Sequence, residues 1–372
     1  MNFDYNEEQQ LLADSVRRFL AKDYTFEARK KIVASKDGWS PQVWSTLVEM
    51  GLTGLPFSPD YGGFGGGAVD LMGVMEAAGD ALLVEPYLPT LMGGFAVARA
   101  GSDAQKKAIL SAVVEGKLKL AFAQTEKGSR YNLAKVETQA RISTAGAGAG
   151  WEITGEKVVV LGAGAADKFV VSAKTEKGLS LFLIEKNAVK IKPYITLDEQ
   201  RAGDVMLSKT PGELLGTEGG ALAAIEETVD YATALICAEA VGAMKFACDT
   251  TLEYLKTRKQ FGVPIGTFQA LQHRMVDMFV ATEQARSMAC LAASKMDSPI
   301  DARDRAKAVS AAKIKIADNA RLVSQEAIQL HGGMGMSDEL KVSHTFRRLT
   351  MIAQQFGDAD HHLARFAMLD RA

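Results

Sequence analysis

The sequence predicts a multi-domain α+β protein in which a β-domain lies between two helical domains. Apolar residues recur every three or four positions up to about residue 118 and again from residue 219, whereas residues between 118 and about 210 alternate with a period of two. A chain of 372 residues is long enough for two or three domains. We therefore predict an N-terminal helical domain over residues 1–118, a β-sandwich or barrel-like domain over 119–213 and a C-terminal four-helix bundle over 214–372.

Composition argues against several classes of protein. The 43 basic and 45 acidic residues leave a net charge of -2, which offers no bulk attraction for nucleic acid. Apolar runs fall short of the roughly 18 residues that a membrane span needs, and the first residues do not resemble a signal peptide. Cys237, Cys248 and Cys290 lie in helical patterns, so we expect buried free thiols in a reducing cytoplasm.

Five helices are predicted in the N-terminal domain, over residues 7–20, 41–50, 69–81, 87–100 and 102–115. Ser40 is expected to cap the second of these helices, with Pro41 at its first position. Ser102 and Gln105 form a capping-box pattern before the last one.

Five β-strands are predicted in the middle domain, over residues 118–123, 151–154, 156–160, 168–172 and 179–184, with hairpin turns at 148–150 and 176–178. Gly162-Ala-Gly164 follows one of these strands and resembles a dinucleotide-binding turn. That motif needs a helix directly after the glycines, to hold a pyrophosphate at its N-terminus. Another strand starts at Lys168, which leaves no room for such a helix, so we reject a nicotinamide site.

The C-terminal domain is predicted to contain helices over residues 222–258, 268–296, 302–330, 338–351 and 360–369. Arg258 lies at the end of the first helix, which Gly262 and Pro264 terminate. Two interpretations of this corner are open. Arg258 is either a surface residue at a helix–turn–helix corner, or it binds a diphosphate through two N–H groups of its guanidinium. In the second case Gly262 lets the backbone come close to the diphosphate.

The motif Arg258-Lys-Gln-Phe-Gly262, with Phe268-Gln269 after it and Gln329-Leu-His-Gly-Gly-Met-Gly335 downstream, resembles the signatures of the acyl-CoA dehydrogenase family. The resemblance extends over nearly the whole chain. It implies FAD as cofactor, an acyl-CoA thioester as substrate and α,β-desaturation as the reaction. It also implies an oligomer, because this family shares each flavin site between the β-domain of one chain and the helical bundle of its neighbour.

The resemblance assigns cofactor-binding roles to residues in both halves of that site. Arg258 matches the group that binds the diphosphate, and Thr125 belongs to the motif beside the flavin ring. The remaining cofactor-binding positions, at the adenosine end, are Gln260, Phe261, Ile265, Phe268, Gln329, Gly332 and Gly333. For the two glycines a helix C-cap is an equally good interpretation.

Two functional positions of the family carry other residues in this chain. Val159 and Leu161 occupy the places of an aromatic residue and a threonine that back the flavin ring. Phe356 stands where the family's usual catalytic glutamate lies, and Ala232 occupies the alternate base position. We therefore assign no catalytic base. Asp230, Asp358 and Asp360 are each offset by two residues, which turns a helical side chain away from the matching direction.

Three interpretations stay open. The chain is a base-lacking subunit of a heteromeric acyl-CoA dehydrogenase, similar to the small subunits of bacterial enzymes such as pimeloyl-CoA dehydrogenase. Alternatively, it is a self-sufficient flavoenzyme with Asp358 or Asp360 as a displaced acid, or it is a non-enzymatic assembly module. In the first two cases we expect an oligomer of this chain or a hetero-oligomer with a second chain of the same family.

Overall fold

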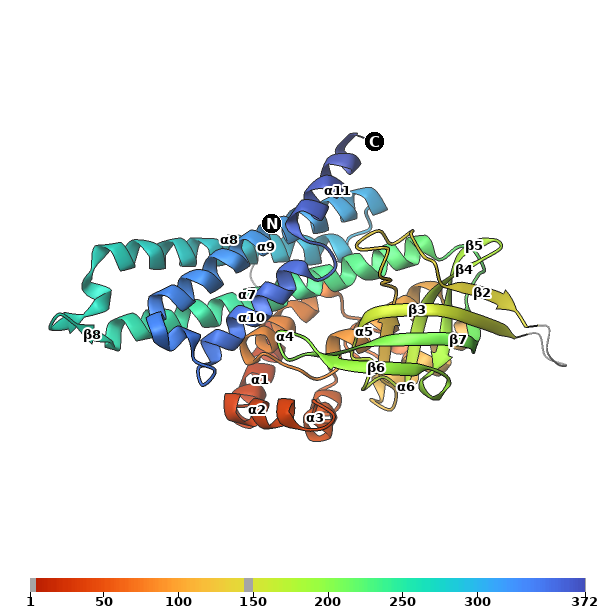
Figure 1. The fold of residues 1–372 in the computed structure, drawn as a ribbon, viewed down its shortest axis with the longest axis horizontal. Coiled ribbons are helices and arrows are strands. Elements are labelled where there is room, and N and C mark those ends of the chain that lie inside the picture. The colour runs from red at the N-terminus through yellow and green to blue at the C-terminus, as the bar shows by residue number, and fades with distance from the viewer. Residues whose placement is uncertain (1–4, 144–149, 372) are drawn as a thin grey trace. The chain divides into compact units, whose positions relative to one another are not determined.

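The computed structural model describes residues 5–143 and 150–371 and confirms the predicted fold class: helices, then a β-sheet domain, then a long helical bundle (Figure 1). The chain forms two compact units, which are described separately. The first comprises Met1–Lys30, Gly67–Leu83 and Thr233–Ala372. The second comprises Lys31–Gly66 and Val84–Ala232.

The first unit is helical. Helix α9 (Ala302–His331) packs against α8 (Gln269–Asp297), α10 (Lys341–Gln354) and α11 (Ala359–Arg371). Helix α4 (Ala68–Ala81) packs against α1 (Glu7–Asp23) and α8. The five C-terminal helices that the sequence predicted are present, and their ends differ from the prediction by at most three residues. Helix α2 (Phe26–Ala34) was not predicted.

Helix α7 (Leu222–Thr257) approaches α4 closely enough for backbone to meet backbone. A Cβ at Gly79 would lie 1.9 Å from the carbonyl oxygen of Glu239, and one at Gly242 would lie 1.8 Å from that of Glu76. Only glycine fits at these two positions, because a side chain at either would force the helices apart. The two glycines therefore set the distance between α4 and α7.

Three helices of the second unit, α3 (Pro41–Glu49), α5 (Tyr87–Ala100) and α6 (Asp103–Val114), agree with the prediction. Ser40 accepts a hydrogen bond from the backbone N–H of Val43 at 3.3 Å and so caps α3, with Pro41 at the first helical position. Ser102 and Gln105 form the predicted capping box at the start of α6. These caps satisfy backbone N–H groups that have no partner within their own helix.

The sheet of the second unit closes on itself through the order β4-β2-β3-β7-β5-β4, with β1 added on β4 and β6 on β7. Its strands, within the described residues, are β1 (Leu120–Ala123), β2 (Gln139–Ile142), β3 (Trp151–Leu161), β4 (Lys168–Thr175), β5 (Gly178–Glu185), β6 (Lys190–Ile195) and β7 (Arg201–Leu215). Its interior is a buried cluster that includes Ile153, Phe169 and Phe182. This arrangement confirms the barrel-like β-domain.

The strand predictions were partly wrong. The two short strands predicted over 151–160 are one strand, β3, and β2, β6 and β7 were missed. The predicted hairpin at 176–178 is confirmed, since Thr175 pairs with Gly178. The predicted turn at 148–150 falls largely outside the described residues. Residues 162–165 form a turn that leads directly from β3 towards β4 without a helix, as the rejection of a nicotinamide site requires.

One buried ion pair ties the segment after β1 to the sheet. Lys157 Nζ lies 2.6 Å from Glu126 Oε1 and donates to Ser172 Oγ at 3.0 Å. Thr138 donates to the same carboxylate through its hydroxyl and its backbone N–H. Burial lowers the pKa of Lys157 to about 8, although Glu126 opposes the shift. The pair remains charged at neutral pH, because both the ammonium and the carboxylate keep several hydrogen-bond partners.

Helix α7 is long and apolar enough to span a membrane, but 89% of the relevant window is buried inside the protein. A core helix of a soluble protein passes the same test, so this length carries little weight. Cys237 and Cys248 are buried free thiols, as predicted. Cys290 is partly exposed, so the prediction of burial was wrong for that residue.

Candidate functional site

The first signature forms a tight hairpin directly after α7. Strands β8 (Lys259–Gln260) and β9 (Val263–Pro264) pair, and Phe261 and Gly262 occupy the turn with φ of 54° and 82°. A turn with two left-handed positions is the hairpin type in which glycine is most favoured. The backbone N–H of Ile265 donates to the carbonyl oxygen of Arg258 at 2.8 Å, which closes the loop. Arg258 and Ile265 are thereby held side by side.

The second signature lies next to the first because of an aromatic stack. Tyr254, one helical turn before Arg258, stacks on His331 with ring centroids 4.5 Å apart and an interplanar angle of 26°. His331 stands between Gln329 and Gly332 at the end of α9. Burial lowers the pKa of His331, so the ring is neutral when it stacks. The structure therefore brings together two motifs that lie about 70 residues apart.

The groups at this end of the bundle fit a diphosphate. The Arg258 side chain is exposed, and within the described part of the chain it makes no hydrogen bond or ion pair. A Cβ built at Gly262, Gly332 or Gly333 would meet no atom within 4 Å, so the backbone is open there. A free guanidinium beside accessible backbone is a suitable site for phosphate oxygens. Gly332 also caps α9, with φ of 58°, as the structural interpretation of this glycine predicted.

Exposed aromatic rings accompany these groups. Phe261 is 90% exposed and meets Phe268 edge to face, with centroids 6.2 Å apart. Gln260 is exposed in β8, and Ile265 is half-buried in the short helix η3 (Ile265–Thr267). An exposed phenyl ring on a rigid turn is a suitable surface for a purine to stack on. These are the residues that the sequence analysis predicted to bind the adenosine end of FAD.

The residues that the resemblance predicts beside the flavin ring belong to the second unit. The carbonyl oxygen of Thr125 accepts a hydrogen bond from the N–H of Val158 at 2.9 Å, so Thr125 lies beside the β3 bulge. Val159 is 49% exposed at φ of 54°, a strained conformation for a β-branched residue. Its N–H donates to Tyr194 Oη at 3.0 Å. Neither Val159 nor Leu161 carries a donor or an aromatic ring, so these side chains do not fit a flavin ring.

Phe356, which the sequence analysis placed at the family's base position, lies on a turn between α10 and α11. Phe356 has φ of 59°, and its carbonyl oxygen lies 3.2 Å from His362 Nε2. Arg348 fixes the residue before it, by donating from Nη1 to Gln355 Oε1 at 3.2 Å. Arg348 is itself fixed by a bidentate, buried ion pair with Glu239, at 2.6 and 2.8 Å. The left-handed conformation at Phe356 is thus held from both sides.

Lys313 anchors the other end of this turn. Its buried Nζ donates to the carbonyl oxygens of Gly357 at 2.6 Å and Ala353 at 3.1 Å. Ala353 belongs to the last turn of α10, where carbonyl oxygens have no partner within the helix. Burial lowers the pKa of Lys313 to about 8, while Cys237 and Asp358 oppose the shift. Lys313 therefore joins the end of α10 to the turn that carries Phe356.

Three of the four other candidate positions offer no better base. The carboxylate of Asp358 accepts the N–H of His361 at 2.8 Å and so caps α11. Asp360 is exposed in the first turn of that helix, where an acidic residue is commonly found. Ala232 is completely buried in α7, and an alanine accepts no proton. Phe356 stands alone at the centre of the anchored turn.

Sequence reasoning missed the residues that build this turn: Lys313, Arg348, His362 and Glu239. The signal for Lys313 was a lysine in the buried stripe of α9, between Val309 and Ile316 at helical spacing. Arg348 likewise interrupts the buried face of α10 beside Leu349 and Ile352. A charged residue inside an apolar stripe indicates a buried polar contact, but not its partner.

Comparison with known proteins identifies the family of this chain. Models of the acyl-CoA dehydrogenase N-terminal, middle and C-terminal domains match residues 6–117, 121–205 and 219–368. Acyl-CoA dehydrogenase FadE12 of Mycobacterium tuberculosis is 31% identical, over 95% of this chain and 93% of its own length. The chain belongs to the acyl-CoA dehydrogenase family.

Two solved structures extend the comparison. A variant of the Tcur3481-Tcur3483 steroid ACAD is 28% identical with a TM-score of 0.88, and the match covers 98% of both chains. "PigA with FAD and proline" is 27% identical with a TM-score of 0.89, and the match covers 99% of this chain and 98% of the other. The chain is thus an oxidoreductase of a family that uses FAD.

We predict that Lys313→Met loosens the turn at residues 355–358. The variant loses two hydrogen bonds from a charged donor and leaves the carbonyl oxygens of Ala353 and Gly357 unsatisfied, which costs roughly 2–4 kcal/mol. Hydrogen exchange should show faster exchange at the amides of 356–358 in the variant. As a matched control, Lys245→Met removes an exposed lysine paired with Asp249 on α7. It should change neither the free energy of unfolding nor the exchange of the amides of 356–358.

The same variant should change how stability depends on pH. The folded pKa of Lys313, about 8, lies below its ordinary value of 10.5, so between these values the unfolded chain binds more protons. Stability contributed by this group therefore rises with pH across that window and is lost as pH falls through 8. The facing groups Cys237 and His362 stay neutral there, with pKa values near 12 and 2. If the free energy of unfolding changes with pH by the same slope in the unmodified protein and in Lys313→Met, the lowered pKa of Lys313 is contradicted.

Proposed function

We propose that this chain is the base-lacking subunit of a heteromeric, FAD-dependent acyl-CoA dehydrogenase. The observation that carries the proposal is Phe356: a phenyl ring stands at the base position of a turn that Lys313, His362 and Arg348 hold in place. Desaturation of an acyl-CoA needs a carboxylate to accept the α-proton of the thioester. In this proposal a second acyl-CoA dehydrogenase chain supplies that carboxylate.

This chain's contribution is to bind one end of the cofactor. FAD, when bound, supplies the hydride acceptor. Arg258 pairs with the diphosphate, and the open backbone at Gly262, Gly332 and Gly333 lets phosphate oxygens approach. The adenosine contacts come from Gln260, Phe261, Ile265, Phe268 and Gln329. Thr125, in the second unit, remains at the flavin-ring site, where Val159 and Leu161 replace the other side chains.

Two observations support assembly with a related chain. The Tcur3481-Tcur3483 structure, which is 28% identical to this chain, is named after two gene products. In this chain, moreover, the adenosine-end residues are intact while the side chains behind the ring are replaced by Val159 and Leu161. We place the assembly in the cytoplasm, in keeping with its three free cysteines.

The alternative of a self-sufficient enzyme requires Asp358 or Asp360 as the base. Asp358 is occupied as the N-cap of α11, which counts against it. The third alternative, a module without flavin, requires that the exposed Arg258 has no anionic ligand. Both remain outcomes of the experiments below.

The amount of flavin bound per chain separates these alternatives. The purified chain alone should hold little FAD, and the complex with its partner should hold about one FAD per pair of chains. Absorbance of the protein and of the released flavin gives the ratio directly. One FAD per chain in the absence of a partner indicates the self-sufficient enzyme, and no FAD in either sample indicates the assembly module.

Arg258→Ala should weaken FAD binding by the assembled protein by roughly 2–3 kcal/mol, because a bidentate, charged contact is lost. Arg258→Lys should recover only part of this affinity, since an ammonium group cannot donate two parallel hydrogen bonds to the diphosphate. Titration of the FAD-free complex followed by flavin fluorescence measures both effects. The control is Arg18→Ala on α1, which removes another exposed arginine. Unchanged affinity in Arg258→Ala would show that the adenosine-end assignment is wrong.

The partner-free chain should show no dehydrogenation of any acyl-CoA with an artificial electron acceptor. Loss of a general base typically costs about 10²–10⁴-fold in rate, and weak binding of the flavin ring adds to that loss. Phe356→Glu should restore little activity by itself, because Val159 and Leu161 still leave the ring unsupported. Robust turnover by the unmodified chain would instead identify Asp358 or Asp360 as the base.

A further inference from the structure

Exposed methionines gather at the second signature. Within the described residues, two of the exposed methionines, Met334 at 50% and Met336 at 76%, lie in the short helix η4 (Gly332–Met336). Another, Met368 at 66%, lies on α11. Methionine is usually buried, and where it is exposed it often contacts a ligand or a partner. Two exposed thioethers within three positions therefore indicate a contact surface.

The backbone of η4 holds these two side chains outward. Gly335, which stands between them, is buried, and a Cβ there would lie 2.6 Å from the carbonyl oxygen of Ile328. Only glycine lets η4 pack this closely on the end of α9. The N–H of Ser337 donates to the carbonyl oxygen of Met334 at 3.0 Å and ends the short helix. Met334 and Met336 thus flank a tightly packed position and extend from a fixed backbone.

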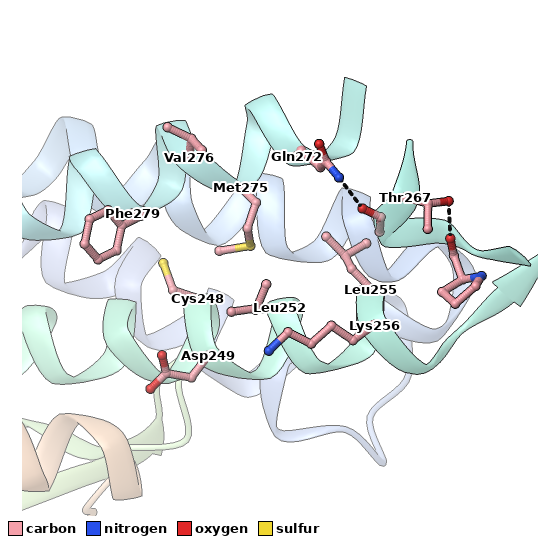
Figure 2. A pocket seen from close by; sticks show the side chains of 12 residues that line it. Cys248, Asp249, Leu252, Leu255, Lys256, Thr267, Gln272, Met275, Val276 and Phe279 are labelled. Atoms are coloured by element: carbon pink, nitrogen blue, oxygen red, sulfur yellow. Dashed lines mark hydrogen bonds between the residues drawn. The ribbon is translucent and has the colours of Figure 1, made fainter. Parts of the chain in front are cut away.

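The turn of the first signature, next to η4, is also fixed. The Gln272 amide donates to the carbonyl oxygen of Gly266 at 2.9 Å, and the Thr267 hydroxyl donates to that of Pro264 at 2.7 Å (Figure 2). The aromatic stack at the end of α9 places this turn beside η4. The two exposed methionines therefore lie at the end of the bundle where the adenosine end of FAD is proposed to bind.

We propose that Met334 and Met336 make FAD binding sensitive to oxidation. This role rests on the proposed function, because it requires the adenosine of FAD to contact the two thioethers. A thioether is apolar and polarizable and packs well against an aromatic ring such as adenine. A sulfoxide is polar, and its oxygen carries partial negative charge. Oxidation therefore disfavours the ring contact and the approach of phosphate oxygens to the open backbone at Gly332 and Gly333.

Hydrogen peroxide is the oxidant in this proposal. A sulfur lone pair attacks one peroxide oxygen, so that an S–O bond forms and the O–O bond breaks. The proton of the transferred oxygen passes to the leaving hydroxide, which departs as water. Sulfur loses two electrons and peroxide gains them. Peroxide forms when dioxygen oxidises a reduced flavin, so a flavoprotein generates this oxidant at its own site. Methionine sulfoxide reductases reverse the change, which suits it to regulation.

Other oxidisable side chains are less accessible to peroxide. Met278, for example, is completely buried. Two of the three cysteines are buried, and burial raises the pKa of the Cys290 thiol, so that little of its reactive thiolate is present. Peroxide should therefore act first on Met334, Met336 and Met368. Only the first two of these lie at the proposed adenosine end.

Mild peroxide treatment of the FAD-free complex of this chain with its partner, followed by titration with FAD, tests the proposal. Peptide mass spectrometry should find an added oxygen on Met334 and on Met336, and none on Met278. Oxidation should raise the Kd for FAD roughly 10-fold, because a polar group replaces an apolar contact. Subsequent treatment with methionine sulfoxide reductases should restore the original Kd.

Two variants separate these residues from other targets of peroxide. In the double variant Met334→Leu/Met336→Leu, which nearly conserves side-chain volume, peroxide should leave the Kd for FAD as it was before treatment. The control Met368→Leu removes an exposed methionine on α11 and should respond to peroxide as the unmodified protein does. The proposal is overturned if Met334 and Met336 stay unoxidised, if their oxidation leaves the Kd unchanged, or if the double variant shows an equal rise.

These outcomes are distinguishable from failure of the proposed function. If Arg258→Ala weakens FAD binding and oxidation does not, the adenosine-end site is supported and the oxidation sensitivity alone is wrong. If FAD affinity responds to neither change, the assignment of the adenosine end is wrong as well. A complex that binds no FAD before oxidation overturns both.

Discussion

The turn that carries residue 356 depends on one buried cation. Lys313 reaches two carbonyl oxygens, one in the last turn of α10 and one at Gly357, and thereby ends the helix and shapes the turn in one contact. A buried ammonium is costly, as its lowered pKa shows, so it persists where carbonyl groups need a donor that backbone cannot supply. The geometry at position 356 is therefore fixed by its surroundings and not by the side chain that stands there.

In the second unit, too, one residue has a backbone conformation that its surroundings fix and its own side chain does not. Val159 adopts φ of 54°, and its N–H is held by Tyr194 and lies 3.3 Å from Asp204 Oδ1. A non-glycine residue in this region costs on the order of 1–3 kcal/mol and persists where neighbouring contacts over-determine it. Val159 and Phe356 both adopt such a conformation, at positions where the family resemblance predicts an aromatic residue and a glutamate. Both conformations are therefore held by neighbouring contacts rather than by the side chain at the position itself.

The sequence predicted the helical parts of the fold well and the sheet less well. Long, strongly periodic helices such as α7 and α9 show their buried face over eight or more turns, so the pattern identifies them reliably. Strand β7 was missed because Gly203, Pro211 and Gly212 interrupt its pattern. Its conformation comes from pairing with β3, β5 and β6, which is not visible in a local window.

Residues of the candidate site were predictable where their contacts are local in the sequence, and were missed where their partners are distant. The motif around Arg258 is local, so the sequence was enough to predict that the helix ends there at Gly262 and Pro264, although the hairpin of β8 and β9 was not predicted. The role of Lys313 is not local, because its partners Ala353 and Gly357 lie 40 and 44 residues further along the chain. Arg348 and Glu239 are 109 residues apart. A buried charge can be recognised from an apolar stripe, but its partner depends on how the helices pack.

The anchored turn also constrains where a proton acceptor can arise in this chain. Asp358 is the nearest carboxylate to position 356 in the sequence, and it caps α11 through the N–H of His361. Turning that side chain towards a substrate would remove the cap, which costs about 1 kcal/mol. It would also disturb the start of α11, from which His362 reaches the carbonyl oxygen of Phe356. A base at Asp358 and an intact turn are thus in conflict, and a carboxylate supplied by another chain avoids that conflict.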